Sequence, residues 1–112
     1  MPTSPPMRVL IADDEGPARQ RIRQLLRKEP GLDILAEVAD GLETVDRILN
    51  DRPDLVFLDI EMPELSGFGV LERVGPEHMP ATVFTTAYNQ HAIHAFEVNA
   101  LDYLLKPIDP ER

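Results

Sequence analysis

At 112 residues, of which 43% are hydrophobic, the chain has room for one globular domain with a real core and not for two. It contains no cysteine, which excludes a disulfide framework, a thiolate metal site and a thiol nucleophile. Its net charge of -9 predicts a domain that repels nucleic acid rather than binding it directly. No apolar run reaches the roughly 20 residues of a membrane span, so we expect a cytoplasmic protein without membrane contact.

From residue 7 onward, apolar runs of strand length alternate with segments of helical periodicity. Residues 1–6 are rich in proline, lack the features of a signal peptide and predict a short disordered lead. Strands are expected at residues 8–12, 34–39, 54–58, 81–86 and 102–105. Helices are expected from Gly16-Pro17 to before Pro30, from Leu42 to before Pro53, and at residues 67–74 and 90–99.

This alternation predicts a parallel sheet with helices on both faces, because crossovers between parallel strands are almost always right-handed. Asp33 and Glu37 interrupt the second strand, which indicates that this strand lies at an edge of the sheet. Asp109-Pro110-Glu111 has the residue types of a helix start, so a fifth helix is predicted to begin just before the chain ends. We therefore expect residues 7–112 to be one domain of a longer protein, cut before its last helix.

Charged residues stand where the first, third and fifth expected strands end. Asp13, Asp14 and Glu15 follow the first strand. Asp59 follows the third strand, and Lys106 follows the fifth. Because the carboxyl ends of parallel strands meet at one edge of the sheet, we expect three of the carboxylates, those of Asp13, Asp14 and Asp59, to lie together with Lys106. The sequence therefore predicts a site for a cation and a phosphate group.

Carboxylates gathered at this edge need a counter-charge. Two carboxylates about 4 Å apart repel by roughly 4 kcal/mol at an effective dielectric constant near 20. Mg²⁺ relieves such repulsion, because it is a small, hard ion that takes one or two carboxylates and keeps waters for a phosphate. The chain has no ligand set for zinc, and His91 and His94, which have no carboxylate pattern beside them, are interpreted as surface residues.

The same residues fit phosphate transfer onto an aspartate, which depends on charge neutralisation and positioning. The set comprises Asp59 as nucleophile, Asp13 and Asp14 as metal carboxylates, Thr86 as hydroxyl donor and Lys106 as cation. Each residue alone has a structural explanation, since a strand-end Asp usually forms a turn, a strand Thr packs and a Lys is solvated. Their common place at one edge, on four strands, favours the functional interpretation.

The chain resembles the receiver domains of two-component response regulators over nearly all of residues 7–112. The resemblance rests on Asp13-Asp14, on Asp59-Ile60-Glu61-Met62-Pro63 with Gly67, on Thr86-Ala87, and on Asp102-Tyr103-Leu104-Leu105-Lys106-Pro107. It implies a flavodoxin-like, doubly wound sheet with strand order 2-1-3-4-5. It also implies that Asp59 accepts phosphate from a sensor histidine kinase. Such a domain is a signalling phosphoacceptor, not an enzyme beyond its own phosphorylation and dephosphorylation.

The resemblance further implies the ligands of the metal. Mg²⁺ would be bound by Asp14, Asp59 and the backbone carbonyl of Glu61, with Asp13 assisting mainly through water. The peptide bond of Lys106-Pro107 would be cis, although only about 5–6% of X-Pro bonds adopt that form.

The resemblance also implies a switch pair, Thr86 and Tyr103, that reports phosphorylation. The segment from Thr85 to Ile108 is similar to the LytR/AlgR subgroup, whose members carry a C-terminal LytTR domain that binds DNA. DNA binding and transcription regulation would then belong to an output domain of the parent protein.

Two other classes of protein compete with this interpretation. A haloacid-dehalogenase-like phosphatase also uses a nucleophilic Asp and Mg²⁺, but it needs a second Asp two residues later, where this chain has Glu61. A receiver-like interaction module that is not phosphorylated usually lacks one of the site residues, whereas all are present here.

Loss of a fifth helix would expose inward residues of the fourth and fifth strands and one flank of the first helix. Apolar patches of several hundred Å² are uncommon on soluble monomers. Hiding about 300 Å² contributes roughly 7 kcal/mol before the costs of association. We therefore expect this chain to self-associate, by pairing these faces or by exchanging elements, more than a complete receiver domain would, and a homodimer is one form that this could take.

Overall fold

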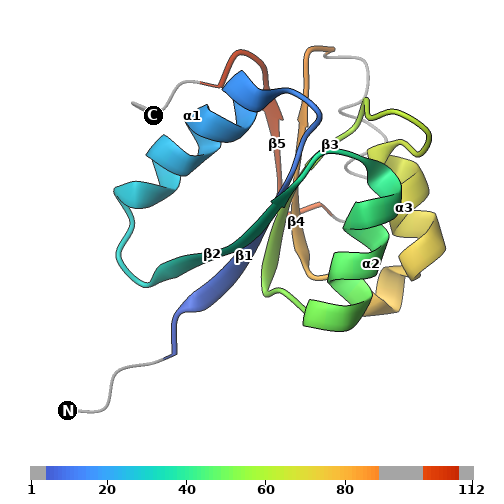
Figure 1. Ribbon diagram of the computed structural model, residues 1–112, viewed down its shortest axis with the longest axis horizontal. Coiled ribbons are helices and arrows are strands. Elements are labelled where there is room, and N and C mark those ends of the chain that lie inside the picture. Colours follow the sequence, from blue (N-terminus) through green and yellow to red (C-terminus); the bar gives the residue numbers. More distant parts are fainter. Residues whose placement is uncertain (1–4, 89–99, 109–112) are drawn as a thin grey trace.

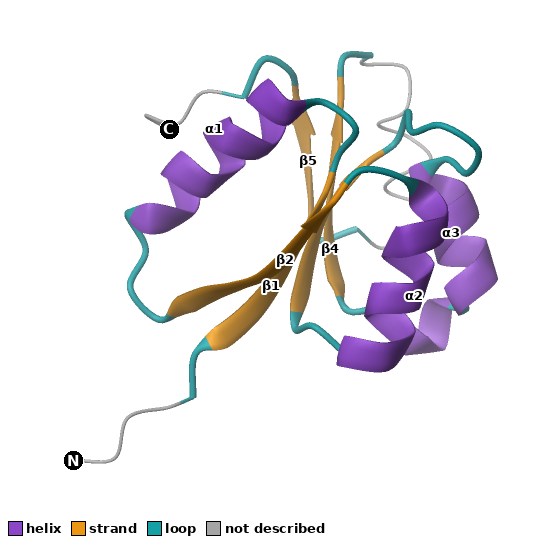
Figure 2. Ribbon diagram, viewed as in Figure 1, coloured by secondary structure: helices purple, strands orange, loops and turns teal. Residues whose placement is uncertain are grey.

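The computed structural model describes residues 5–88 and 100–108, within which five strands form one parallel sheet (Figures 1 and 2). The strands are β1 (Met7–Ala12), β2 (Leu32–Val38), β3 (Leu55–Asp59), β4 (Ala81–Thr86) and β5 (Asp102–Leu105). The helices are α1 (Gly16–Arg27), α2 (Gly41–Asp51), α3 (Gly67–Val74) and the short 3-10 helix η1 (Pro76–His78). The helix predicted at residues 90–99, with His91 and His94, lies outside the described residues.

The strand order is β2-β1-β3-β4-β5, which confirms the flavodoxin-like fold class. β4, β5 and α3 have the predicted bounds. β2 instead begins at Leu32, earlier than predicted, because its pairing with β1 starts opposite Met7. β3 extends to Asp59, because that residue still pairs with Thr85 of β4. The 3-10 helix η1 was missing from the sequence prediction.

The two faces of the sheet are covered by different helices, α1 on one side and α2 and α3 on the other (Figure 1). Alternate residues of each strand feed two apolar cores, as the twofold period of a strand requires. The core on the α1 side includes Val9, Ile11, Ile22, Leu26, Leu55, Phe57 and Val83. The core on the other side includes Leu10, Val45, Ile48, Val56, Leu58, Val70, Leu71, Val74 and Phe84. The central strands β1 and β3 are therefore buried on both faces and give the site a rigid base.

β2 lies at the edge of the sheet, as predicted. Its Glu37 contacts Arg23 at 2.7 Å and Arg19 at 3.4 Å, both from α1. Partly exposed pairs of this kind contribute at most about 1 kcal/mol. Arg19 also donates to the backbone carbonyl of Asp13 at 2.7 Å, so α1 is tied directly to the loop that carries the acidic residues.

The loop between β3 and α3 holds Asp59 tightly against the start of α3. The Gly67 N–H donates to the carbonyl of Ile60 at 2.9 Å, and the Ser66 hydroxyl caps the helix by accepting from Gly69 N at 3.1 Å. A Cβ atom at Gly67 would lie 2.7 Å from the backbone oxygen of Asp59, closer than real Cβ contacts allow. This close approach of two backbones requires glycine.

Within the described ranges, none of the helices combines the length and the apolar character needed to cross a membrane.

Gly67→Ala should lower the free energy of unfolding by roughly 1–3 kcal/mol, because the added methyl group forces α3 away from the Asp59 backbone. Gly16→Ala is the matched control, since its Cβ would meet nothing nearer than Arg19 Nη2 at 3.7 Å. Urea unfolding of both variants measures the difference. Equal stabilities for the two would contradict the importance of this contact.

Candidate functional site

The side chains of the candidate site come from the carboxyl ends of the strands, at the top of Figure 1. Asp13 follows β1 and Asp59 ends β3, and because Ala12 pairs with Leu58 the two acids are neighbours. Both continue the alternate positions that face α1, and both are buried. Thr86 ends β4 one position beyond the residue that pairs with Asp59, so its side chain faces the α2–α3 side.

Lys106 is the centre of the ionic contacts. Its Nζ lies 3.0 Å from Asp13 Oδ2, 3.3 Å from Asp59 Oδ2 and 2.6 Å from Glu15 Oε1. The peptide bond between Lys106 and Pro107 is cis, as predicted. The predicted meeting of carboxylates and lysine at one edge is therefore confirmed. The contact with Glu15 was not predicted, and only its position directly after the acid pair could have pointed to it.

The acidic side chains offer oxygen ligands for a cation. One oxygen from each of Asp13, Asp14 and Asp59 lies within 4.8 Å of the other two. Asp13 is fully buried, and its Oδ2 accepts no hydrogen bond from the described residues, although the Lys106 ammonium supplies charge nearby. A buried carboxylate oxygen without a hydrogen bond is costly. The donor set therefore fits a hard cation that prefers oxygen ligands.

Burial raises the pKa of the Asp59 carboxyl to about 8, and the negative charge of Asp13 adds to the increase. The charge of Lys106 opposes the increase, a hydrogen-bonding contact with Asp14 strengthens it, and the backbone N–H of Glu61 opposes it. Attraction to the lysine is thus weaker than burial and repulsion together. A cation among these carboxylates would favour the ionised, nucleophilic form of Asp59.

Burial by itself would lower the pKa of Lys106, but hydrogen bonds to Glu15 and Asp13 and the charges of Asp59 and Asp13 raise it above its usual value. The hydrogen bond from Lys106 and its charge lower the pKa of the Glu15 carboxyl. The pair therefore favours the charged form of Lys106 at the edge of the sheet and the ionised form of Glu15 beside it.

Thr86 and Tyr103 lie on the opposite side of the sheet from Lys106. Thr86 is fully buried, and its hydroxyl contacts the two carboxylate oxygens of Glu61 at 2.6 and 2.8 Å. Tyr103 is half-buried against the core on the α2–α3 side, and its hydroxyl donates to the backbone carbonyl of Tyr88. The sequence analysis assigned only the backbone carbonyl of Glu61 to the site. Its side-chain contact with Thr86 depends on how the β3–α3 loop folds back.

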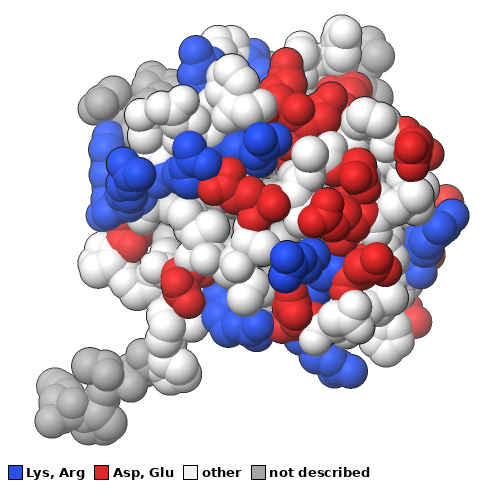
Figure 3. All heavy atoms as spheres, in the orientation of Figure 1, with Lys and Arg blue, Asp and Glu red and all other residues white. Residues whose placement is uncertain are grey.

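Charge is distributed unevenly over the face seen in Figure 3, where Lys and Arg side chains gather over α1.

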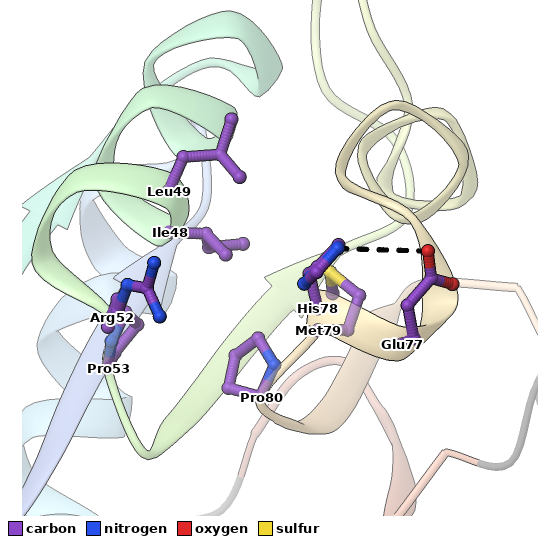
Figure 4. A pocket seen from close by; sticks show the side chains of 8 residues that line it. All are labelled: Ile48, Leu49, Arg52, Pro53, Glu77, His78, Met79 and Pro80. Carbon is purple, nitrogen blue, oxygen red and sulfur yellow. Dashed lines mark ion pairs between the residues drawn. The ribbon is translucent and has the colours of Figure 1, made fainter.

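A pocket of about 400 Å³ lies between the end of α2 and η1 (Figure 4). It is lined by Ile48, Leu49, Arg52, Pro53, Glu77, His78, Met79 and Pro80. These residues precede β3 and β4 rather than follow them. The pocket is therefore at the opposite end of the sheet from the acidic cluster and is separate from the candidate site.

Fold and site together define a doubly wound α/β protein that gathers carboxylates and a lysine at the carboxyl edge of its sheet. Residues 9–112 match the response regulator receiver domain family, to which the chain belongs. Receiver domains are signalling domains rather than conventional enzymes.

Relatives of known sequence include an uncharacterised response regulatory protein of Yersinia pestis, which is 49% identical over 95% of this chain and 44% of that protein. The transcriptional regulatory protein BtsR of Escherichia coli is 44% identical over the same shares of the two chains. This chain thus spans less than half the length of these relatives.

Solved structures show the same architecture. The response regulatory domain of mrkE from Klebsiella pneumoniae has a TM-score of 0.85 and 35% identity, over 95% of this chain and 88% of that one. A chain of the CheX–CheY–BeF3–Mg complex from Borrelia burgdorferi has a TM-score of 0.83 and 28% identity, over 95% of this chain and 82% of that one.

In a chelator, the contribution of Asp59 to the free energy of unfolding should decrease as pH rises from 3.8 toward about 8. The reason is that this carboxyl ionises in the unfolded chain at a lower pH than in the folded protein. Asp59→Asn removes this carboxyl, so the free energy of unfolding of the variant should fall less as pH rises. Near pH 8 it should be higher than that of the wild type by on the order of 2 kcal/mol. Urea unfolding at several pH values measures both proteins. Glu72→Ala, which removes an exposed acid from α3, should follow the wild type. Parallel pH profiles for wild type and Asp59→Asn would show that this carboxyl is not perturbed.

Proposed function

We propose that this domain accepts phosphate on Asp59 from the phosphohistidine of a sensor histidine kinase. The observation that carries the proposal is the setting of Asp59, a buried carboxylate 3.3 Å from the Lys106 ammonium and beside two more aspartates. In the transfer, a carboxylate oxygen of Asp59 attacks phosphorus while the phosphorus–nitrogen bond breaks, and the imidazole nitrogen keeps the electron pair.

Mg²⁺ is the proposed cofactor, held by Asp14, Asp59 and the backbone carbonyl of Glu61, with Asp13 assisting through water. The all-oxygen donor set and the full burial of the Asp13 carboxylate within it support this choice. When bound, the ion supplies neutralisation of the charge on the phosphoryl oxygens. The carboxylates of Asp14 and Asp13 would position the ion beside the Asp59 carboxylate.

Lys106 and Thr86 are the proposed partners of the phosphoryl oxygens. The ammonium of Lys106 already lies beside Asp59, so it can pair with an oxygen of the new group. Movement of Thr86 toward the phosphate would leave space into which Tyr103 turns. That rearrangement biases the surface around β5 between two states, which is how the signal would reach the rest of the protein.

The proposed output of the parent protein is transcription regulation through a LytTR-type DNA-binding domain. In support, BtsR of Escherichia coli is named a transcriptional regulatory protein, and the match covers 44% of its length. The net charge of -9 agrees with DNA binding outside this domain. Self-association as a homodimer, and the division into a lead at residues 1–6 and a domain at residues 7–112, stay predictions.

The phosphatase alternative has little support. Its second acid would have to serve as acid and base beside the nucleophile, whereas the Glu61 carboxylate at that position contacts the Thr86 hydroxyl. Membership of the receiver family also favours a signalling role. A purely interacting, unphosphorylated module would not need the full set of acids and lysine that the structure brings together.

Acetyl phosphate with Mg²⁺ should add one phosphoryl group to the wild type and none to Asp59→Asn, because the amide is not a nucleophile. Intact-mass spectrometry detects the product, and the bond should be labile to base as an acyl phosphate is. Lys106→Ala should bind metal and yet be impaired in phosphorylation. Uptake by Asp59→Asn equal to that of the wild type would disprove the assignment.

Mg²⁺ should raise the free energy of unfolding by RT ln(1 + [Mg²⁺]/Kd), which is about 1.4 kcal/mol at ten times Kd. Asp14→Asn should abolish this increase, while Asp46→Asn on the exposed side of α2 should retain it. Thermal unfolding with and without the ion measures the effect. Unchanged wild-type melting at millimolar Mg²⁺ would count against the site.

A further inference from the structure

The Thr86 hydroxyl is held by a side chain that none of the roles proposed above uses. Thr86 is fully buried at the end of β4, and its Oγ1 lies 2.6 Å and 2.8 Å from the carboxylate oxygens of Glu61. Glu61 follows Asp59 by two residues, and its own backbone N–H donates to Asp59 Oδ1 at 3.1 Å. One short turn therefore contacts both the proposed phosphoacceptor and the proposed switch residue.

A hydroxyl group carries a single hydrogen, so it can donate one strong hydrogen bond at a time. The Thr86 Oγ1 also accepts a hydrogen bond from Tyr88 N at 3.1 Å, which leaves its hydrogen for Glu61. A bond from Thr86 to a phosphoryl oxygen would use the same hydrogen. The bond to Glu61 and the bond to a phosphoryl group therefore exclude each other.

The strand register makes this competition stronger. Asp59 pairs with Thr85, so Thr86 points to the other side of the sheet, toward Glu61. To donate to a group on Asp59, the Thr86 side chain and the end of β4 have to turn. A hydrogen bond to a carboxylate, made by a hydroxyl that is itself fully buried, opposes that turn.

The hydrogen bond between Thr86 and Glu61 is linked to Tyr103 through the backbone of Tyr88. Tyr88 donates its backbone N–H to Thr86, and its carbonyl accepts from the Tyr103 hydroxyl. A turn of Thr86 therefore disturbs a chain of contacts that runs from Glu61 to Tyr103. A hydrogen bond that fixes Thr86 therefore also stabilises the present position of Tyr103.

We propose that Glu61 is a positioning residue whose carboxylate occupies the Thr86 hydroxyl in the unphosphorylated protein and so sets the threshold for the switch. The inference rests on the proposed function, because it needs a phosphoryl group on Asp59 as the competitor. Glu61 contacts neither of the reacting atoms through its side chain in this role. It acts by stabilising the resting state of Thr86, which changes the population of the two states.

The experiment uses beryllofluoride as the phosphoryl probe, at saturating Mg²⁺ determined for each variant. The chain has two tyrosines and no tryptophan, so its tyrosine emission comes only from Tyr88 and Tyr103. Glu61→Ala keeps the backbone carbonyl and removes the competitor. It should shift the resting emission toward that of the beryllofluoride-bound wild type. It should also lower the beryllofluoride concentration at half-saturation by about tenfold, which converts to about 1.4 kcal/mol.

Two further variants separate the hydrogen bond from the charge. Glu61→Gln keeps an acceptor for Thr86 but removes the charge, so it should restore most of the wild-type resting emission and titrate between wild type and Glu61→Ala. Glu72→Ala removes an exposed acid from α3 and should titrate as the wild type does. If Glu61→Gln and Glu61→Ala behave alike, charge repulsion explains the effect and the proposed hydrogen-bond competition is wrong.

Failure of the proposal can be told apart from failure of the proposed function. A wild type that takes up no phosphoryl group from acetyl phosphate would overturn the phosphoacceptor role and the competition with it. A wild type that is phosphorylated, but whose tyrosine emission does not respond to beryllofluoride, would overturn the switch and therefore the role of Glu61 in it. A wild type that responds, with Glu61→Ala and Glu61→Gln giving the same resting emission and half-saturation as wild type, would overturn the role of Glu61 alone. Where Glu61→Ala does not fold, Glu61→Met takes its place in the comparison with Glu61→Gln, because it keeps the length of the side chain but has neither a charge nor an oxygen acceptor.

Discussion

The contact of the Lys106 ammonium with carboxylates from two other strands is the constraint on which this site depends. Lys106 follows β5, yet its Nζ lies within 3.3 Å of acids that end β1 and β3. Removing the lysine would leave Asp13 and Asp59 buried side by side without a compensating charge. Burial still raises the pKa of Asp59 with the lysine in place, so the charge of Lys106 alone does not compensate the carboxylates. This shortage of positive charge supports the cation binding and phosphate chemistry proposed for this edge.

The alternation of side chains along each strand separates two tasks across the thickness of the sheet. Asp13 and Asp59 continue the positions that face α1, where the ionic contacts gather. Thr86 and Tyr103 project to the α2–α3 side. There the Thr86 hydroxyl donates to the Glu61 carboxylate, and the Tyr103 hydroxyl donates to the Tyr88 carbonyl. A change at one side can therefore reach the other through movement of the end of β4 or of the turn at Glu61, which contacts both Asp59 and Thr86.

The Lys106 ammonium and the Thr86 hydroxyl are the two groups that we propose as partners of the phosphoryl oxygens, and a glutamate contacts each of them. Glu15 lies 2.6 Å from the Lys106 ammonium, and Glu61 lies 2.6 Å from the Thr86 hydroxyl. Glu15 is largely exposed and exchanges its contact easily for water, whereas the Thr86 hydroxyl is fully buried. The contact with Glu15 is therefore the more exposed of the two, whereas the contact with Glu61 holds a hydroxyl that solvent does not reach.

The order and composition of the segments determined the fold class and which charged side chains meet at one edge of the sheet. Alternating strands and helices require a parallel sheet, and strands that end in charged residues then have to bring Asp13, Asp59 and Lys106 to one edge. Only the tertiary structure decided which carboxylate oxygen is left without a hydrogen bond and that the Glu61 side chain turns to Thr86. Those contacts depend on the register between β3 and β4 and on the path of a loop closed at Gly67. Such details arise from the packing of segments distant in the chain, which a local pattern of residues does not encode.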